Sequence, residues 1–362
     1  MLFALFTTIL STVVLIPLLT DKKDEKHVNV LFNLFIYFSI ILSLISFFIL
    51  PFIIENQTTV TLSRLLLVQP IIFGLSNLFS SYNQVQNRFL IYSLSPFFYN
   101  LATVLSIIFL YPTHGIKGVV YGIIIGALIH LFIQYYSATK NGFILYWQVI
   151  TENDFKYIKD ILRLTIPRSI ILTIVQLRLI VVTILLSSFS IGSLAIFNLS
   201  YSLQTVPISL FTMSLVIASF PKLTKLYSEN NIIQFWKIFK NVLLKITITS
   251  VFSMIFILLF KNYITYIIYG DVNNAYDISL IFGILSLSIL PVSVELFVTR
   301  TYYAMGQNKT PAILSMLSFF ILLLGSYMTN DLKSLASVFV ISNYISASVF
   351  LYNIYRFKNQ KN

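Results

Sequence analysis

The sequence contains no cysteine and little charge. With no cysteine among its 362 residues, the chain cannot form disulfides, thiolate metal sites or a cysteine nucleophile. Charged residues make up 10% of the chain, whereas a soluble domain usually carries about 25%. The three histidines, His27, His114 and His130, are far apart and show no metal-ligand spacing. The sequence therefore predicts no metal site built on cysteine or histidine.

Apolar residues dominate what is present. They make up 57% of the chain, and the mean hydropathy is +0.88. A soluble protein of this size could not bury so much apolar surface, so the excess is expected to face lipid. The net charge of +12 then fits basic cytoplasmic loops better than nucleic-acid binding. These features predict an all-α polytopic membrane protein whose solvent is the lipid bilayer, with no nucleic-acid partner.

The apolar segments predict eleven transmembrane helices, because a bilayer core of roughly 30 Å needs about 20 apolar residues per helix. Residues 179–221 contain no charged side chain and are too many for one span, so a turn at Ser187, Ser188, Ser190 and Gly192 is expected to divide them. The predicted spans are 1–19, 29–54, 63–84, 89–112, 118–138, 161–187, 192–220, 239–260, 276–299, 310–329 and 334–355.

The distribution of basic residues predicts the orientation of these spans. If alternate loops are assigned to the cytoplasm, starting with residues 20–28, that side holds 17 of the 24 lysines and arginines and the other side holds four. The other three, Arg168, Arg178 and Lys245, lie within spans. The C-terminus is then cytoplasmic and Met1 lies outside. A missing helix before Met1 would account for this orientation, so we expect either a truncated gene product or a wrongly assigned start.

An internal repeat relates the two halves of the chain. An offset of 221 residues aligns Pro70 with Pro291, Tyr82 with Tyr303, Gln86 with Gln307, Asn87 with Asn308 and Arg88 with Lys309. The matched segments have the same orientation, which is typical of two lobes related by an axis along the membrane normal. We expect an N-lobe of about five helices at 1–150 and a C-lobe of about six at 151–362. The missing helix would be the partner of span 161–187.

Three segments resemble a known transporter family. Residues 300–311, Arg-Thr-Tyr-Tyr-Ala-Met-Gly-Gln-Asn-Lys-Thr-Pro, resemble the R-x-F-Y-A-x-x-D-x-x-T-P segment of the MurJ (MviN) family of lipid II flippases. Residues 192–224, with Pro207 and Pro221, resemble the family's eighth helix, and residues 70–100 resemble its fourth and fifth. The resemblance implies the fold of the multidrug/oligosaccharidyl-lipid/polysaccharide (MOP) exporters, with two lobes around a central cavity.

The resemblance also implies a function. A member of this family would flip undecaprenyl-linked peptidoglycan precursor, lipid II, across the bacterial inner membrane by alternating access, and so support cell wall biogenesis and cell shape. Its partners would be a polyprenyl-pyrophosphate-linked glycan and cell-wall synthesis proteins. The family's arginine in helix eight falls on Ser202, and an aspartate linked to sodium binding in some members falls near Val182. Alternatives are a flippase of O-antigen or capsule type, an inactive truncated relative and, less favoured, a membrane glycosyltransferase.

Charged and polar residues inside spans are the candidate site residues, because a charge there costs about 2.5–3.5 kcal/mol. Arg178 and Arg168 are candidates to hold the lipid pyrophosphate, since the guanidinium fork can bond two oxygens at once. The alternatives are a structural pair for Arg178 and snorkelling for Arg168. Gln204, Asn198 and Asn343 would either line the cavity or bond to neighbouring helices.

Glu295 is the only acidic residue within a predicted span. It would bind a coupling cation or a proton, or form a structural pair with Arg178 or Arg300. The other acids form no dense motif, and there is no P-loop. We therefore expect a transporter and no enzyme, with no cofactor and no metal, driven by Na⁺, H⁺ or the membrane potential.

Small residues and prolines predict features of packing and shape. Gly118, Gly122 and Gly126 form a small-xxx-small row, which is typical of a helix-packing face. Kinks are expected in three spans, at Pro167, Pro207 and Pro291.

Overall fold

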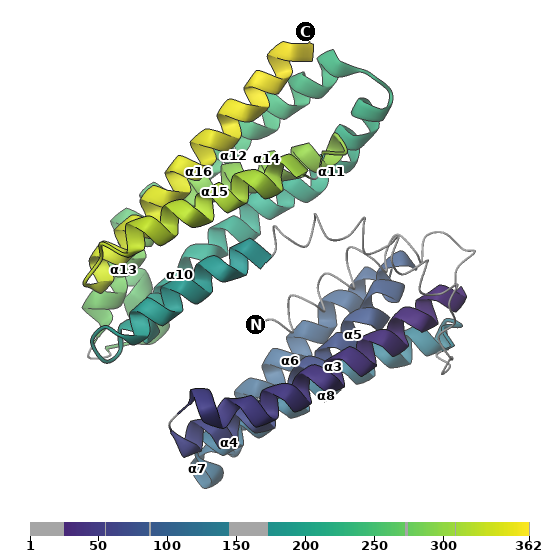
Figure 1. The fold of residues 1–362 in the computed structure, drawn as a ribbon, viewed down its shortest axis with the longest axis vertical. Coiled ribbons are helices and arrows are strands. Elements are labelled where there is room, and N and C mark those ends of the chain that lie inside the picture. Colours follow the sequence, from purple (N-terminus) through teal and green to yellow (C-terminus); the bar gives the residue numbers. More distant parts are fainter. Residues whose placement is uncertain are drawn as a thin grey trace. The chain divides into compact units, whose positions relative to one another are not determined.

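The chain divides into two compact units, Met1–Ser169 and Ile170–Asn362, which we call the N-lobe and the C-lobe. The computed structural model describes residues 25–54, 56–86, 88–144, 173–271, 274–307 and 309–361. The predicted all-α fold is confirmed, because these residues form helices and no strand (Figure 1). The lobe boundary predicted at residue 150 falls between 145 and 172, outside the described residues.

The N-lobe is a bundle in which α8 packs against α5 and α6, while α3 packs against α5 (Figure 1). Helix α4 begins where the Asn56 side chain accepts hydrogen bonds from the backbone N–H groups of Thr58 and Thr59, at 2.9 and 3.1 Å. The helices are α3 (Glu25–Ile53), α4 (Gln57–Leu66), α5 (Val68–Val85), α6 (Phe89–Phe109), α7 (Tyr111–His114) and α8 (Ile116–Lys140).

Glycines allow α8 and α6 to approach closely. An added Cβ at Gly122 would lie 1.9 Å from Ser106 Oγ, and one at Gly118 would lie 2.5 Å from the carbonyl oxygen of Leu110. Gly126 faces the backbone of Tyr99 in the same way. The predicted helix-packing face is therefore confirmed, and its partner is α6.

Buried hydrogen bonds also join α5, α6 and α8. Asn83 Nδ2 donates to Gln134 Oε1 at 2.7 Å, and Ser137 Oγ donates to Asn83 Oδ1 at 2.9 Å. Gln134 Nε2 then donates to Ser95 Oγ at 2.8 Å. All four side chains are buried, so this network holds three helices together within the apolar bundle.

The C-lobe begins, among the described residues, with a helix at Thr173–Ser187. The turn predicted after this helix is confirmed, and Gly192 adopts the left-handed conformation there with φ of 95°. The following elements are α10 (Ser193–Pro207), the π-helix η2 (Ile208–Thr212), α11 (Met213–Ser228), α12 (Ile232–Tyr269), α13 (Ala275–Ser286), α14 (Ile289–Ala304), α15 (Lys309–Ser326) and α16 (Leu332–Lys361).

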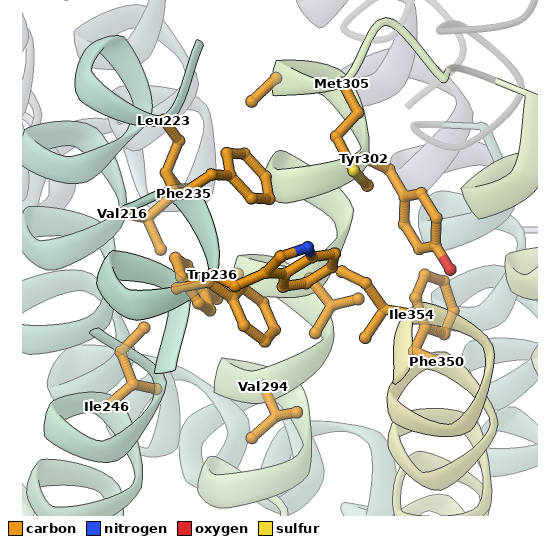
Figure 2. Packing of buried hydrophobic residues seen from close by; sticks show 14 of the residues in the cluster. Val216, Leu223, Phe235, Trp236, Ile246, Val294, Tyr302, Met305, Phe350 and Ile354 are labelled. Carbon is orange, nitrogen blue, oxygen red and sulfur yellow. The ribbon is translucent and has the colours of Figure 1, made fainter. Parts of the chain in front are cut away.

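An aromatic cluster forms one core of the C-lobe. The rings of Phe239 on α12 and Phe297 on α14 stack at 5.3 Å, and both side chains are fully buried. Figure 2 shows Trp236 of α12 between α14 and α16, where it faces Ile354 and Phe350. This packing connects α12, α14 and α16 at the end of the lobe where α16 terminates.

The described helices match the predicted spans from the second to the eleventh. Among the described residues, seven helices are long and apolar enough to cross a membrane, and the bent pair α13–α14 makes an eighth. Two shorter apolar helices, Leu94–Phe109 and Thr173–Ser187, lie at the predicted fourth and sixth spans. The predicted first span, 1–19, lies outside the described residues, so the count of eleven stays a prediction.

Helix α12 is longer than the span predicted at 239–260. It continues to Tyr269 and contains 38 residues, or about 57 Å at 1.5 Å per residue. No glycine or proline interrupts it until Gly270, whose φ of 71° ends the helix. Lys261, which was expected in a loop, therefore lies within α12, where its side chain covers Gly283 of α13.

Both lobes contain an interrupted helix at the position of the sequence repeat. Helix α5 begins two residues before Pro70 and directly follows α4, while α14 begins two residues before Pro291 and follows α13 after a bend of 43°. The break before Pro291 is the predicted kink. Asn87 and Asn308, which are paired in the repeat, lie outside the described residues.

Pro207 also lies at an irregularity. It ends α10 and is followed by η2, where the Met213 N–H donates to the Ile208 carbonyl in the i to i+5 pattern of a π-helix. Proline supplies no backbone N–H, which favours a change of helical register at this point. Pro167, the third proline expected to kink a span, lies outside the described residues.

Candidate functional site

Arg178 is buried inside the C-lobe. It lies on the helix Thr173–Ser187, and 8% of its surface is exposed. Its Nη2 donates to Ser342 Oγ at 3.2 Å and to Asn343 Oδ1, both on α16. Its Cζ also lies 5.6 Å from the ring centroid of Phe339. Nε is buried and has no hydrogen-bond partner, so the guanidinium retains one donor for a further acceptor.

Glu295 is the acidic residue whose charge acts on Arg178. It is partly buried on α14, and its Oε2 accepts a hydrogen bond from Ser346 Oγ at 2.7 Å. No direct ion pair links Glu295 to Arg178 in the described part of the chain, where both side chains form hydrogen bonds with neutral groups of α16. The two charges therefore interact at a distance through the protein interior.

Helix α16 connects the two charges. Ser342, Asn343 and Ser346 occupy positions i, i+1 and i+4 on it, so they lie on neighbouring turns of one face. Tyr201 on α10 completes the group, because its ring lies 6.0 Å from the ring of Phe339, which Arg178 also contacts. We call Arg178, Tyr201, Glu295, Ser342, Asn343 and Ser346 the C-lobe polar cluster.

The sequence identified only part of this cluster. It singled out Arg178, Glu295 and Asn343, because each is a charged or amide side chain inside a span. It missed Tyr201, and it also missed Ser342 and Ser346, since serine is common in membrane helices and carries little signal alone. Their spacing around Asn343, Ser-Asn-x-x-Ser, was the signal available at residues 342–346.

The other predicted site residues that the structure describes lie apart from the cluster. Gln204 is 1% exposed, and its Nε2 donates to Ser288 Oγ at 2.8 Å, while its Oε1 has no partner. Asn198 is exposed on α10, and Arg300 is exposed on α14 with its Cζ 6.0 Å from the ring of Tyr303. Arg168 lies outside the described residues. The substrate-binding roles of Gln204, Asn198 and Arg168, and the pairing of Arg300 with Glu295, stay predictions.

The C-lobe contains a groove whose lining side chains are all apolar except Ser253. It has a volume of about 300 Å³ and lies between α10–η2 and α12, and Phe282 of α13 also lines it. No charged side chain lines it, and neither Arg178 nor Gln204 reaches it. Such a groove can hold an alkyl or isoprenoid chain and offers no ligand for a phosphate. Its walls include Leu203, Pro207, Leu210, Phe252 and Phe256.

The donor set of the cluster defines its chemistry. A guanidinium with a free N–H can bind an anionic oxygen, and a nearby carboxylate can take up a proton or a cation. Among the described residues, no group of three histidine or acidic side chains could hold a metal ion. His130 of the N-lobe is buried and pairs through Nδ1 with Ser76 Oγ at 2.6 Å.

Solved structures share this architecture at low sequence identity. A lipid II flippase MurJ in an inward closed conformation aligns with a TM-score of 0.83 and 18% identity, over 98% of this chain and 78% of the other. An inward-facing MATE family multidrug resistance transporter of the MOP superfamily aligns with a TM-score of 0.76 and 17% identity, over 98% and 89% of the two chains. These matches establish the fold.

A further structure extends the likeness within the superfamily. A MOP superfamily transporter from Pyrococcus furiosus aligns with a TM-score of 0.71 and 17% identity, over 100% of this chain and 85% of the other. None of the curated proteins matches the chain in sequence. The family model described as lipid II flippase MurJ, however, matches residues 1–362. The chain is therefore a member of the MurJ family of lipid II flippases.

Proposed function

We propose that this protein translocates lipid II, the undecaprenyl-linked peptidoglycan precursor, across the bacterial inner membrane by alternating access. The observation that carries the proposal is the match of the MurJ family model to the whole chain. The MATE transporters that share the fold have been solved in inward-facing and outward-facing conformations, with TM-scores of 0.76 and 0.68 to this chain. A fold that exists in both states suits alternating access.

In this proposal Arg178 is the residue that attracts the lipid pyrophosphate. Its unpartnered Nε–H supplies a donor, and Arg168, Gln204 and Asn198 are the further candidates for contact with the glycan headgroup. The polyprenyl tail stays in the hydrocarbon layer, for which the groove beside α12 is suited. The protein performs no catalysis, and Na⁺, H⁺ or the membrane potential supplies the energy. Cell-wall synthesis proteins are its proposed partners, and its C-terminus is cytoplasmic.

Complementation tests the proposed function. The chain is expressed in bacteria depleted of their own lipid II flippase, and growth and lysis are followed. Rescue of growth at normal membrane levels is the expected result. Lysis despite normal membrane levels would contradict lipid II transport and would favour another lipid-linked oligosaccharide, of O-antigen or capsule type, or an inactive relative.

Variants of Arg178 test its role in the same cells. Arg178→Ala removes the charge and the hydrogen bonds to α16, and we expect it to abolish rescue, whereas Arg178→Lys keeps the charge and should retain part of it. Arg356→Ala is the matched control, because Arg356 is exposed near the end of α16 and lies outside the cluster. If Arg178→Ala rescues as well as the unaltered chain, Arg178 does not bind the substrate.

A further inference from the structure

The C-lobe polar cluster holds two opposite charges that are not in direct contact. Arg178 donates hydrogen bonds to neutral side chains, and Glu295 accepts a hydrogen bond from a serine. Burying two charges without contact is costly, and a structural ion pair would bring them within hydrogen-bonding distance. Nε of Arg178 has no hydrogen-bond partner, so the guanidinium can bind a further acceptor.

The net charge of the cluster depends on whether Glu295 is protonated. With both groups ionised, the pair is neutral. When Glu295 takes up a proton, one positive charge remains inside a low-dielectric lobe, where an uncompensated charge is strongly destabilising. Arg178 must then find another anion or change position. The change would be transmitted to α16, because Ser342 and Asn343 bond Arg178 and Ser346 bonds Glu295.

Among the described residues, no other charge competes for this role. Arg178 is the charged group that acts on Glu295, and Tyr201 of α10 is the other titratable side chain in the cluster. On α14 itself and on the helices packed against it, Lys261 and Lys358 are partly buried, and the other basic residues whose exposure is described are exposed: Lys222, Lys225, Lys237, Lys240, Lys245, Arg300, Lys309, Lys333 and Arg356. Protonation of Glu295 would therefore remove the negative charge that acts on Arg178.

We propose that Glu295 is a proton-binding site of the C-lobe, and that its protonation frees Arg178 to bind the anionic group of the substrate. A proton fits better than a metal cation, because Asn343 Oδ1 is already used by Arg178 and the guanidinium would repel a second cation. In the transport cycle, the proton enters from water onto the Glu295 carboxylate and leaves by the reverse step. The coupling to transport rests on the proposed function, whereas proton binding does not.

Infrared difference spectroscopy tests the proton site. Spectra of the full chain in lipid nanodiscs are recorded between acidic and alkaline pH, and the carbonyl stretching band of a protonated carboxyl group is followed. Glu295→Gln should remove one such band. Glu229→Gln is the matched control, because Glu229 is an exposed acid 3.8 Å from Lys225, and it should leave that band in place. A spectrum of Glu295→Gln that keeps every band of the unaltered chain would overturn the proposal.

The double variant Arg178→Gln with Glu295→Gln covers the case in which the single variant does not fold, since it removes both charges together. It should fold and lack the band. Transport is then measured as lipid II flipping in proteoliposomes at several pH values, and Glu295→Gln should lose the pH response of the unaltered chain. A retained pH response would refute coupling. If the unaltered chain does not flip lipid II, the proposed function fails, and the infrared result still decides the proton site.

Discussion

At the scale of single residues, the charge of Arg178 is governed by its neighbours on α16. Two of its acceptors, Ser342 and Asn343, are neutral and nearly fully buried. Hydrogen bonds to neutral groups stabilise a guanidinium less than a carboxylate contact does. Arg178 is thus held in place, and its charge stays available to Glu295 or to an anionic ligand. A tight ion pair would make the charge unavailable.

The close packing at Gly122 predicts that a larger side chain there lowers the stability of the N-lobe. Gly122→Ala would place a methyl group 1.9 Å from Ser106 Oγ, so α6 and α8 must separate. We expect the N-lobe to lose about 1–3 kcal/mol of unfolding free energy, measured by thermal unfolding in detergent. Adding Ser106→Gly should recover stability, because it removes the two atoms, Ser106 Oγ and Cβ, that lie within 2.0 Å of the methyl group.

A matched substitution on the outward face of α8 provides the control. Leu128 is 49% exposed and faces away from α6, so Leu128→Ala should change the unfolding temperature little, since lipid is as apolar as leucine. If Gly122→Ala were as mild as Leu128→Ala, the close contact of α6 with α8 would not be a source of stability.

At the scale of elements, two irregular helices of the C-lobe are joined side by side. Gln204 of α10 bonds Ser288, which lies in the break between α13 and α14, and Thr212 Oγ1 of η2 donates to Ser293 Oγ of α14 at 2.8 Å. The π-helix and the break therefore lie next to each other and share buried hydrogen bonds. Irregular helix segments of this kind are frequent at functional sites, where they allow bending.

Removal of one residue tests the π-helix. A π-helix accommodates one extra residue, so deletion of Leu210 would restore regular α-helix and leave α10 and α11 in nearly the same register. Thr212 should then remain near Ser293, and α11 should keep its packing with α12. We expect the deletion variant to elute as folded protein in size-exclusion chromatography. Leu210→Ala keeps every residue and serves as the control, and a deletion variant that is lost while Leu210→Ala stays folded would contradict this account.

At the scale of the whole molecule, the absence of cysteine allows the orientation to be tested directly. Ile191, between the helix Thr173–Ser187 and α10, is fully exposed, and Ile233 at the start of α12 is 87% exposed. The distribution of basic residues predicts that Ile191 is extracytoplasmic and Ile233 cytoplasmic. Each is replaced by cysteine in turn and treated with a membrane-impermeant maleimide.

The expected labelling is asymmetric. Ile191→Cys should react in intact spheroplasts, whereas Ile233→Cys should react only after the membrane is permeabilised. The unaltered chain has no thiol, so it provides an unlabelled background. The opposite pattern would reverse the predicted topology and place the C-terminus outside.

The amino-acid sequence by itself determined the class of the protein and most of its helices. Lipid is the only solvent that tolerates so many apolar residues, and the length of a span follows from the thickness of the bilayer. Three further features could be predicted because each depends on the local geometry of glycine or proline. They are the glycine row on α8, the turn at Gly192 and the break before Pro291.

Only the tertiary structure decided which side chains meet. Arg178 and Asn343 are 165 residues apart, and Glu295 and Ser346 are 51 apart, so no local pattern reveals that they form one cluster. Hydropathy also failed to predict that α12 ends only at Gly270, beyond the predicted span. Lys261 can remain inside this helix because its side chain lies over Gly283 of α13. Hydropathy reports how each residue partitions into lipid, whereas contacts between helices depend on three-dimensional packing.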